Sequence, residues 1–130
     1  MIQPILPQGA PSPRGPYSPA VRAGDFIFVS GQGPVDAQTD QLSPGDIRHE
    51  TRLTLANIRR ILESGGASIQ DVVKVCVYLV NAAEFAAMNE VYAEVFGEHR
   101  PARTTVQAGM VAPMRIEIDC IAYKPVAGTP

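Results

Sequence analysis

The chain has 130 residues, 45% of them hydrophobic and 18% charged, with a formal net charge of −2. This composition is typical of one globular domain that buries its own core, and residues 1–130 are interpreted as that single domain. It lacks the basic excess of nucleic-acid-binding proteins, so we expect no nucleic-acid partner. We also expect a cytoplasmic protein with no membrane partner, because no apolar run could span a bilayer and the first residues lack a signal-peptide pattern.

Prolines dominate the start of the chain. Within residues 1–16 they stand at positions 4, 7, 11, 13 and 16. Proline donates no backbone hydrogen bond, so this segment is predicted to be an extended N-terminal arm or loop. Two strands are predicted next, at residues 20–22 and 26–30, and the second is rich in aromatic and β-branched residues.

A helix is predicted to begin in residues 43–46, with Ser43 as its N-cap and Pro44 at its first position. Side chains then recur at steps of three and four, as on one face of a helix. This stripe consists of Ile47, Thr51, Leu55, Ile58 and Leu62. The pair Gly65-Gly66 predicts that the helix ends in a left-handed cap.

Residues 71–80 are apolar on nearly both alternating faces, which predicts a strand covered on both sides. A second capping pattern at residues 81–84 predicts another helix, which ends at Gly97. Residues 101–106 and 115–122 alternate with period two, as strands do. The order β-β-α-β-α-β-β predicts an α+β fold, a mixed β-sheet with two helices packed on one face.

The other face of this sheet is predicted to be half apolar and half polar. It would expose Val72, Cys76, Tyr78 and Val80 beside Arg103 and Asp119. Such a face is usually buried against other copies of the same chain. We therefore predict a homo-oligomer in which polar residues line clefts between subunits.

The known motifs of catalytic and metal sites are absent from the sequence: Gly-X-Ser-X-Gly, Cys-X-X-Cys, His-Glu-X-X-His and a phosphate-binding glycine loop before a helix. His49 and His99 are far apart, and Cys76 and Cys120 lack the partners that a zinc site needs. We expect both cysteines to be reduced and buried. No metal and no cofactor are predicted.

Arg103 is the clearest candidate for chemistry, because it begins a strand directly after a proline and an alanine. Two interpretations stay open. It could form a structural salt bridge to Asp119 or Glu117, or it could bind a substrate carboxylate through two parallel hydrogen bonds. Asp119 in turn could be its ion-pair partner or a separate group that orients a water. If the last two strands are neighbours, the arginine, the Thr105 hydroxyl and the two carboxylates could gather on one sheet face.

Six short motifs, in order, resemble the Rid/YjgF imine deaminase family over nearly the whole chain. They are Gly15-Pro16-Tyr17, Val29-Ser30-Gly31-Gln32, Asn57, Met88-Asn89-Glu90-Val91-Tyr92, Pro101-Ala102-Arg103-Thr104 and residues 116–122. The resemblance implies a chorismate-mutase-like α+β fold that assembles as a homotrimer with ligand clefts between subunits. It also implies cofactor-free hydrolysis of reactive enamines or imines, such as 2-aminoacrylate, to 2-keto acids and ammonia.

Carried onto this sequence, the resemblance implies that Arg103 holds the substrate carboxylate. The substrate-binding residues that it implies are Tyr17, Ser30, Asn89, Arg103 and Thr105. Asp119 stands where these deaminases usually have a glutamate that activates the attacking water, and it is one methylene shorter. Thr105 stands where many of them have a cysteine, although any residue keeps the backbone carbonyl that is thought to contact the water.

The resulting hypothesis is a 2-imino or 2-enamine acid deaminase with a role in metabolite damage control. The reaction needs little machinery, because a protonated imine carbon is already electrophilic. Two alternatives stay open. One is a non-catalytic module that binds or senses a keto or amino acid through Arg103. The other is a related deaminase or hydrolase that acts on a different substrate, such as an aminomuconate- or carbamate-type compound.

Overall fold

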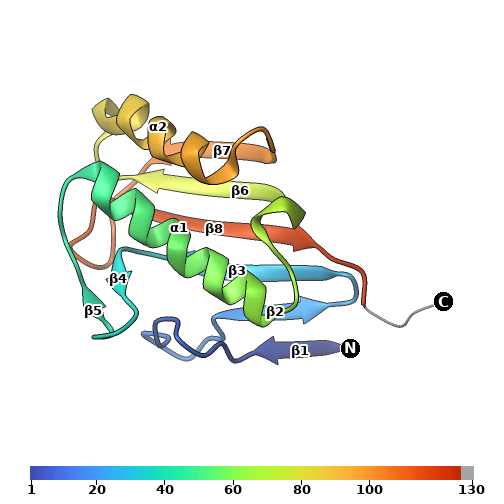
Figure 1. Ribbon diagram of the computed structural model, residues 1–130. Helices are drawn as coiled ribbons and strands as arrows, with labels where there is room; N and C mark the ends of the chain where they lie inside the picture. Colours follow the sequence, from blue (N-terminus) through green and yellow to red (C-terminus); the bar gives the residue numbers. More distant parts are fainter. Residues whose placement is uncertain (127–130) are drawn as a thin grey trace.

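The structure is a computed structural model that describes residues 1–126, and it has two layers (Figure 1). One layer is a six-stranded sheet with the order β1-β2-β3-β8-β6-β7. Its strands are β1 (Ile2–Ile5), β2 (Ala20–Ala23), β3 (Phe26–Gln32), β6 (Val72–Leu79), β7 (Ala102–Gln107) and β8 (Ile116–Tyr123). The pair β6–β7 is parallel and the other neighbours are antiparallel.

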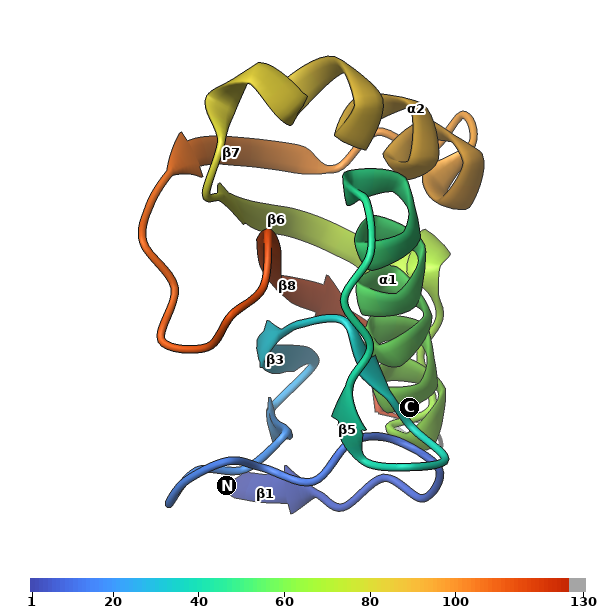
Figure 2. The same cartoon turned by 90° about the vertical axis from the view of Figure 1, so that its left-hand side faces the viewer.

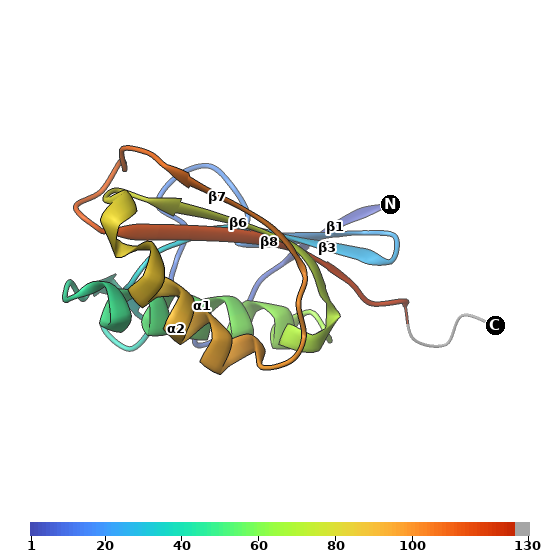
Figure 3. The ribbon, with the colours of Figure 1, turned by 90° about the horizontal axis from the view of Figure 1, so that it is seen from above.

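The second layer consists of two helices, α1 (Ile47–Ser64) and α2 (Phe85–Phe96), which cover the same face of the sheet. Seen from above, both helices lie on one side and no helix covers the opposite face (Figure 3). The predicted α+β class, with a mixed sheet and two helices on one face, is therefore confirmed. Short elements complete the fold: the hairpin β4 (Val35–Asp36) and β5 (Gln41–Leu42), and the 3-10 turns η1 (Ile69–Asp71) and η2 (Ala82–Glu84).

The proline-rich start is part strand and part loop. Strand β1 pairs antiparallel with β2 at the edge of the sheet, where Pro4 lies opposite Val21. An edge strand tolerates a proline because one side of its backbone has no strand partner. Residues 6–19 contain no helix or strand, as predicted for a loop.

Helix α1 begins three residues later than predicted, because Asp46 is its N-cap instead of Ser43. The Asp46 carboxylate accepts a hydrogen bond from the backbone N–H of His49 at 2.8 Å. The backbone N–H of Ser43 donates instead to the carbonyl of Pro34, so the chain is still tied beside the β4–β5 hairpin there. The left-handed residue near the C-terminal end is Gly66, with φ of +84°, as the glycine pair predicts.

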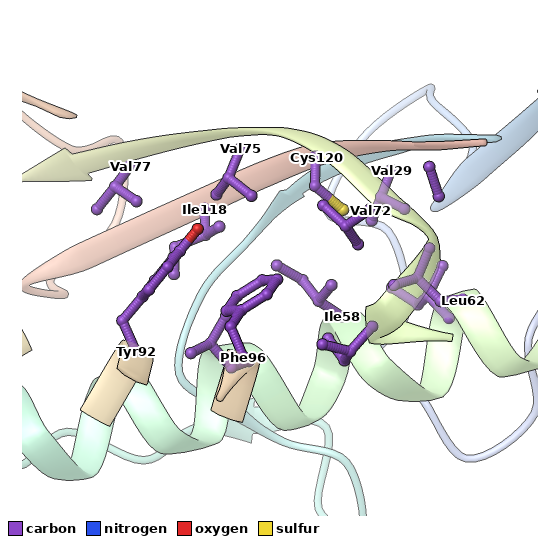
Figure 4. Close-up of a cluster of buried hydrophobic side chains, with 14 of the residues drawn as sticks. Val29, Ile58, Leu62, Val72, Val75, Val77, Tyr92, Phe96, Ile118 and Cys120 are labelled. Carbon is purple, nitrogen blue, oxygen red and sulfur yellow. The ribbon is translucent and has the colours of Figure 1, made fainter. Parts of the chain in front are cut away.

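The core lies between the helices and the sheet (Figure 4). All five residues of the predicted α1 stripe are buried. From α2, the stacked rings of Tyr92 and Phe96 point toward the sheet, with their centroids 4.4 Å apart. They face the apolar side chains of β6 and β8, among them Val75, Val77 and Ile118.

Strand β6 corrects one prediction about the open face. Val72 was expected there with Cys76 and Tyr78, but it is fully buried beneath the helices. The register with β8 shifts between Val72 and Lys74, and such a bulge moves the following side chains to the other face. As a result Val72 and Val75 both face the core. The helices cover one face of β6 only, so the expectation of cover on both sides is not met within this chain.

Neither helix within residues 1–126 is long and apolar enough to cross a membrane.

Candidate functional site

Arg103 and Asp119 lie on opposite faces of the sheet, which contradicts the expectation that they gather on one face. Arg103 pairs in parallel register with Val75, which is buried under the helices. Asp119 alternates with the buried residues Ile118 and Cys120, so it faces the open side. Strand β6 also separates β7 from β8. Within residues 1–126 Arg103 forms no salt bridge to Asp119 or Glu117.

The neighbours of Arg103 are aromatic rings of α2. Its guanidinium carbon lies 4.6 Å from the ring centroid of Tyr92 and 5.6 Å from that of Phe85. No carboxylate of the described residues pairs with it. Rings can hold a guanidinium by cation–π attraction without using its N–H donors. Because no carboxylate of the described residues takes up those donors, they are available to an anion from outside the chain.

A hollow of about 330 Å³ opens beside this arginine. It is lined by Asn89, Tyr92, Ala93, Arg100, Pro101 and Arg103. Burial raises the pKa of the Tyr92 hydroxyl, while the positive charges of Arg103 and Arg100 act in the opposite direction. The hydroxyl is therefore neutral at physiological pH.

Three buried polar atoms near Arg103 have no hydrogen-bond partner within the described residues. They are Asn89 Oδ1, the Tyr92 hydroxyl and Thr105 Oγ1. Thr105 follows Arg103 by two residues on β7 and pairs with buried Val77, so it lies on the same face. Buried polar atoms are nearly always paired in folded proteins. Such a group of unpaired atoms indicates a place where a polar ligand or water completes the site.

Tyr17 and Ser30 lie on a different part of the molecule. The Ser30 hydroxyl donates to the carbonyl of Ser18 at 2.6 Å, and the Tyr17 hydroxyl accepts from the backbone N–H of Arg14 at 3.0 Å. Tyr17 lines a second cavity of about 330 Å³, formed by residues of the 11–19 loop, the end of β3, the β4–β5 hairpin, the loop before β8 and Glu117. In Figure 2 the loop between β7 and β8 lies above the end of β3, and the segment before β2 lies below it.

Two carboxylates lie on the open face of β8. A Cβ atom at position 31 would collide with the side chain of Glu117, so a larger residue there would force Glu117 to move. Burial raises the pKa of Glu117, and the negative charge of Asp119 raises it further. Asp119 Oδ2 accepts a hydrogen bond from the Tyr78 hydroxyl at 2.9 Å, and this bond is the main reason that the pKa of Tyr78 is raised to about 12.

One chain therefore brings the predicted site residues together only as two groups. We call Asn89, Tyr92, Arg103 and Thr105 the arginine edge, because they lie along β7 and α2. We call Ser30, Tyr78, Glu117 and Asp119 the carboxylate face, with Tyr17 in the loop nearby. Within residues 1–126 no group of three or more His, Cys, Asp or Glu side chains is placed to hold a metal. Cys120 is buried and Cys76 half-buried, and neither forms a disulfide.

Sequence analysis missed the roles of three aromatic residues. Phe85 and Tyr92 hold the guanidinium of Arg103, and the Tyr78 hydroxyl donates to Asp119. The spacing of Phe85, Asn89 and Tyr92 is four and then three residues, which places them on one face of a helix. This spacing beside the candidate Asn89 is the sequence signal that could have placed Phe85 and Tyr92 at the site. For Tyr78 no comparable signal existed, because its contact with Asp119 joins different strands.

Comparison with known proteins gives the family. The model of the family described as Endoribonuclease L-PSP matches residues 7–124. The chain belongs to this family, which is the Rid/YjgF family. It is 50% identical over 125 residues to a RutC family protein of Pyrococcus horikoshii, which covers 95% of this chain and 99% of the relative.

Two further Rid relatives carry functional information. The 3-aminoacrylate deaminase RutC of Acinetobacter baylyi is 43% identical over 120 residues, which is 92% of this chain and 95% of that protein. The crystal structure of Escherichia coli TdcF with bound serine superposes with a TM-score of 0.88 at 36% identity. That match covers 94% of this chain and 98% of TdcF.

Proposed function

We propose that this Rid protein hydrolyses reactive enamine or imine derivatives of 2-amino acids to 2-keto acids and ammonia. The observation that carries the proposal is the arginine edge, where Arg103 has no carboxylate partner and the buried Asn89 Oδ1 has no donor among residues 1–126. Arg103 requires an anion, and Asn89 Oδ1 requires an N–H group. A 2-imino acid supplies both on adjacent carbons. The deaminase named among the relatives supports the same reaction class.

In this mechanism Arg103 binds the substrate carboxylate through two N–H donors, and the rings of Phe85 and Tyr92 fix the plane of the guanidinium. Asn89 Oδ1 accepts a hydrogen bond from the substrate nitrogen. An enamine first takes a proton at carbon to become the iminium. Water then adds to the electrophilic carbon and loses a proton to a base, and the carbinolamine expels ammonia. The 2-keto acid remains on Arg103 until it is released.

The base and the rest of the cleft come, in our proposal, from a second copy of the chain. Asp119, Ser30 and Tyr17 of one subunit would face Arg103 of the next in a homotrimer. The open sheet face supports this assembly, since Phe26, Phe28, Val106 and Tyr123 are each 40–45% exposed on it or at its rim. Apolar surface of this extent commonly marks a contact between subunits. The cytoplasmic location and the independence of any cofactor stay predictions.

One observation favours a second candidate, a module that binds a keto or amino acid without turnover. The only described side chain that donates to Asp119 is Tyr78, and neither residue lies near Arg103 in the same chain. Binding at the arginine edge needs no base. Such a module would be stabilised by a keto acid but would not consume an imine.

The deciding experiment couples the protein to an amino-acid oxidase or a pyridoxal-phosphate dehydratase and follows imine decay by trapping with semicarbazide. We expect the wild type to accelerate decay. Arg103→Ala should lose activity by about 100-fold or more, because a charge-assisted bidentate contact is removed. Arg103→Lys keeps the positive charge but not the two parallel N–H donors, so we expect a partial loss of activity.

The matched control is Arg59→Ala. Arg59 is exposed on α1 and makes no ion pair with any residue from 1 to 126. Unchanged activity in this variant would show that loss at position 103 is local. Full activity of Arg103→Ala would remove Arg103 from the mechanism. A correctly assembled wild type that binds keto acids but leaves imine decay unchanged would favour the binding module.

A further inference from the structure

The carboxylate of Asp119 has a single described hydrogen-bond donor, the hydroxyl of Tyr78, at 2.9 Å from Oδ2. The two residues belong to neighbouring antiparallel strands, β8 and β6, and both face the open side of the sheet. Directly opposite Asp119 on β6 is Cys76, and Glu117 precedes it on the same face. The hydroxyl of Ser30 on β3 is already bonded to the carbonyl of Ser18. Within residues 1–126, Oδ1 of Asp119 is therefore left without a donor.

Tyr78 is suited to a fixed, permanent role. Its hydroxyl keeps its proton at every physiological pH, since the hydrogen bond to Asp119 raises its pKa to about 12. It therefore acts as a donor and is not itself the base. The aromatic ring has only two torsions and stands on a sheet strand, so the oxygen that it presents to Asp119 is well placed.

We infer that Tyr78 is the positioning residue of Asp119: it holds Oδ2 and leaves Oδ1 as the atom that takes the proton of the attacking water. This inference rests on the proposed function. An aspartate carboxylate turns about a soft terminal torsion. A hydrogen bond to one oxygen fixes that torsion, and it thereby fixes the direction in which the other oxygen can accept a proton.

The pairing also accounts for a shorter acid at this position. The phenol oxygen lies 2.9 Å from Asp119 Oδ2, so a side chain that is one methylene longer would bring its carboxylate closer to that oxygen. Tyrosine and aspartate are thus complementary in length. A glutamate in place of Asp119 would have to displace the hydroxyl, whereas a glutamate opposite phenylalanine would have that space to itself.

The test is a double-mutant cycle in the imine-decay assay, with kcat and KM measured separately. We expect Tyr78→Phe to lower kcat by about 10–30-fold with KM changed less than twofold, because Arg103 still binds the substrate. Asp119→Glu alone should also lower kcat. The double variant Tyr78→Phe with Asp119→Glu should be at least fivefold more active than either single variant.

The control is Thr39→Val, which removes an exposed hydroxyl outside the six-stranded sheet without removing a side-chain hydrogen bond to any residue from 1 to 126. It should keep wild-type kcat. Size and melting temperature are recorded for every variant, so that misfolding is recognised.

Each outcome either supports or contradicts the positioning role of Tyr78. A wild-type kcat for Tyr78→Phe would overturn the positioning role of Tyr78, and so would a double variant no more active than the two single variants. The proposed function would still stand in either case if turnover depends on Arg103. A wild type without any turnover would overturn both.

Discussion

The arginine edge and the carboxylate face differ in how their polar groups are satisfied. On the carboxylate face, Ser30 is bonded to the Ser18 carbonyl and Asp119 to Tyr78. At the arginine edge, Asn89 and Thr105 each keep a buried atom without a partner from residues 1–126. The hydroxyls of Ser30 and Tyr78 are thus bonded within a single chain, although Oδ1 of Asp119 still lacks a donor among residues 1–126. In the proposed function, the ligand supplies the missing partners at the arginine edge, while Tyr78 already holds Asp119 before the ligand binds.

At the arginine edge, the largest effect after loss of Arg103 itself is expected at Thr105. Thr105→Val removes an unpaired buried hydroxyl and keeps its shape. We expect kcat/KM to fall by about 10-fold, since a ligand or water loses its partner. The free energy of unfolding of the ligand-free protein should rise by up to about 1 kcal/mol, because a buried group without a partner is removed. Denaturant titration and the imine assay measure the two effects.

A lower kcat/KM together with a higher free energy of unfolding in Thr105→Val would support the view that the Thr105 hydroxyl has no partner until a ligand binds. A fall in stability would instead show that the hydroxyl is already satisfied in the free protein.

A smaller effect is expected at Arg100, which lines the same hollow without contacting the rings that hold Arg103. It is exposed, so its attraction for a carboxylate is weakened by solvent and salt. Arg100→Gln should raise KM by about two- to fivefold, with kcat unchanged. Raising the ionic strength should reduce the difference from wild type. Arg59→Gln serves as the control for a lost surface charge, and an equal change in both variants would rule out a local role for Arg100.

The smallest effect concerns stability at the carboxylate face. Burial raises the pKa of Glu117 in the folded protein above its ordinary value. The folded state therefore favours the protonated form, and the stability from this group is present at low pH and is lost as pH rises through the raised pKa. Glu117→Gln should be more stable than wild type at neutral pH, and the difference should vanish in acid. Melting curves across pH test this, and a difference that grows in acid would contradict it.

The helices could be predicted from the sequence because their signals are local: α1 has a long apolar stripe, and a glycine follows the last residue of each helix. The α1 stripe is buried as predicted. Only the predicted start of the helix is wrong, because its N-cap is Asp46 and not Ser43. The α+β class follows from the order of such elements, and the motifs that resemble the Rid family cover most of the chain. These features depend on residues close together in sequence.

The faces of the strands could not be predicted in the same way. Alternation divides a strand into two faces but does not say which face is covered. On β7 the more polar side, with Arg103, faces the helices, while Val106 is 43% exposed. On β6 a bulge after Val72 moves its neighbours to the other face. The separation of Arg103 from Asp119 results from these non-local pairings, and so does the contact between Tyr78 and Asp119.

In the proposed assembly, one subunit supplies the arginine edge and another supplies the carboxylate face of the same site. Mixing subunits tests it directly. Arg103→Ala and Asp119→Ala are each expected to be inactive as pure proteins. They would be unfolded together, refolded in equal amounts and assayed for imine decay, with separately refolded proteins as the control.

In a randomly mixed trimer, some clefts lie between one subunit of each variant. Such a cleft is intact when its Arg103 comes from an Asp119→Ala subunit and its Asp119 comes from an Arg103→Ala subunit. This arrangement should restore about one quarter of wild-type activity, because the two choices are independent in a symmetric ring. If both groups acted within one chain, every site would lack one of them. Activity that stays at the level of the separate variants would contradict the account.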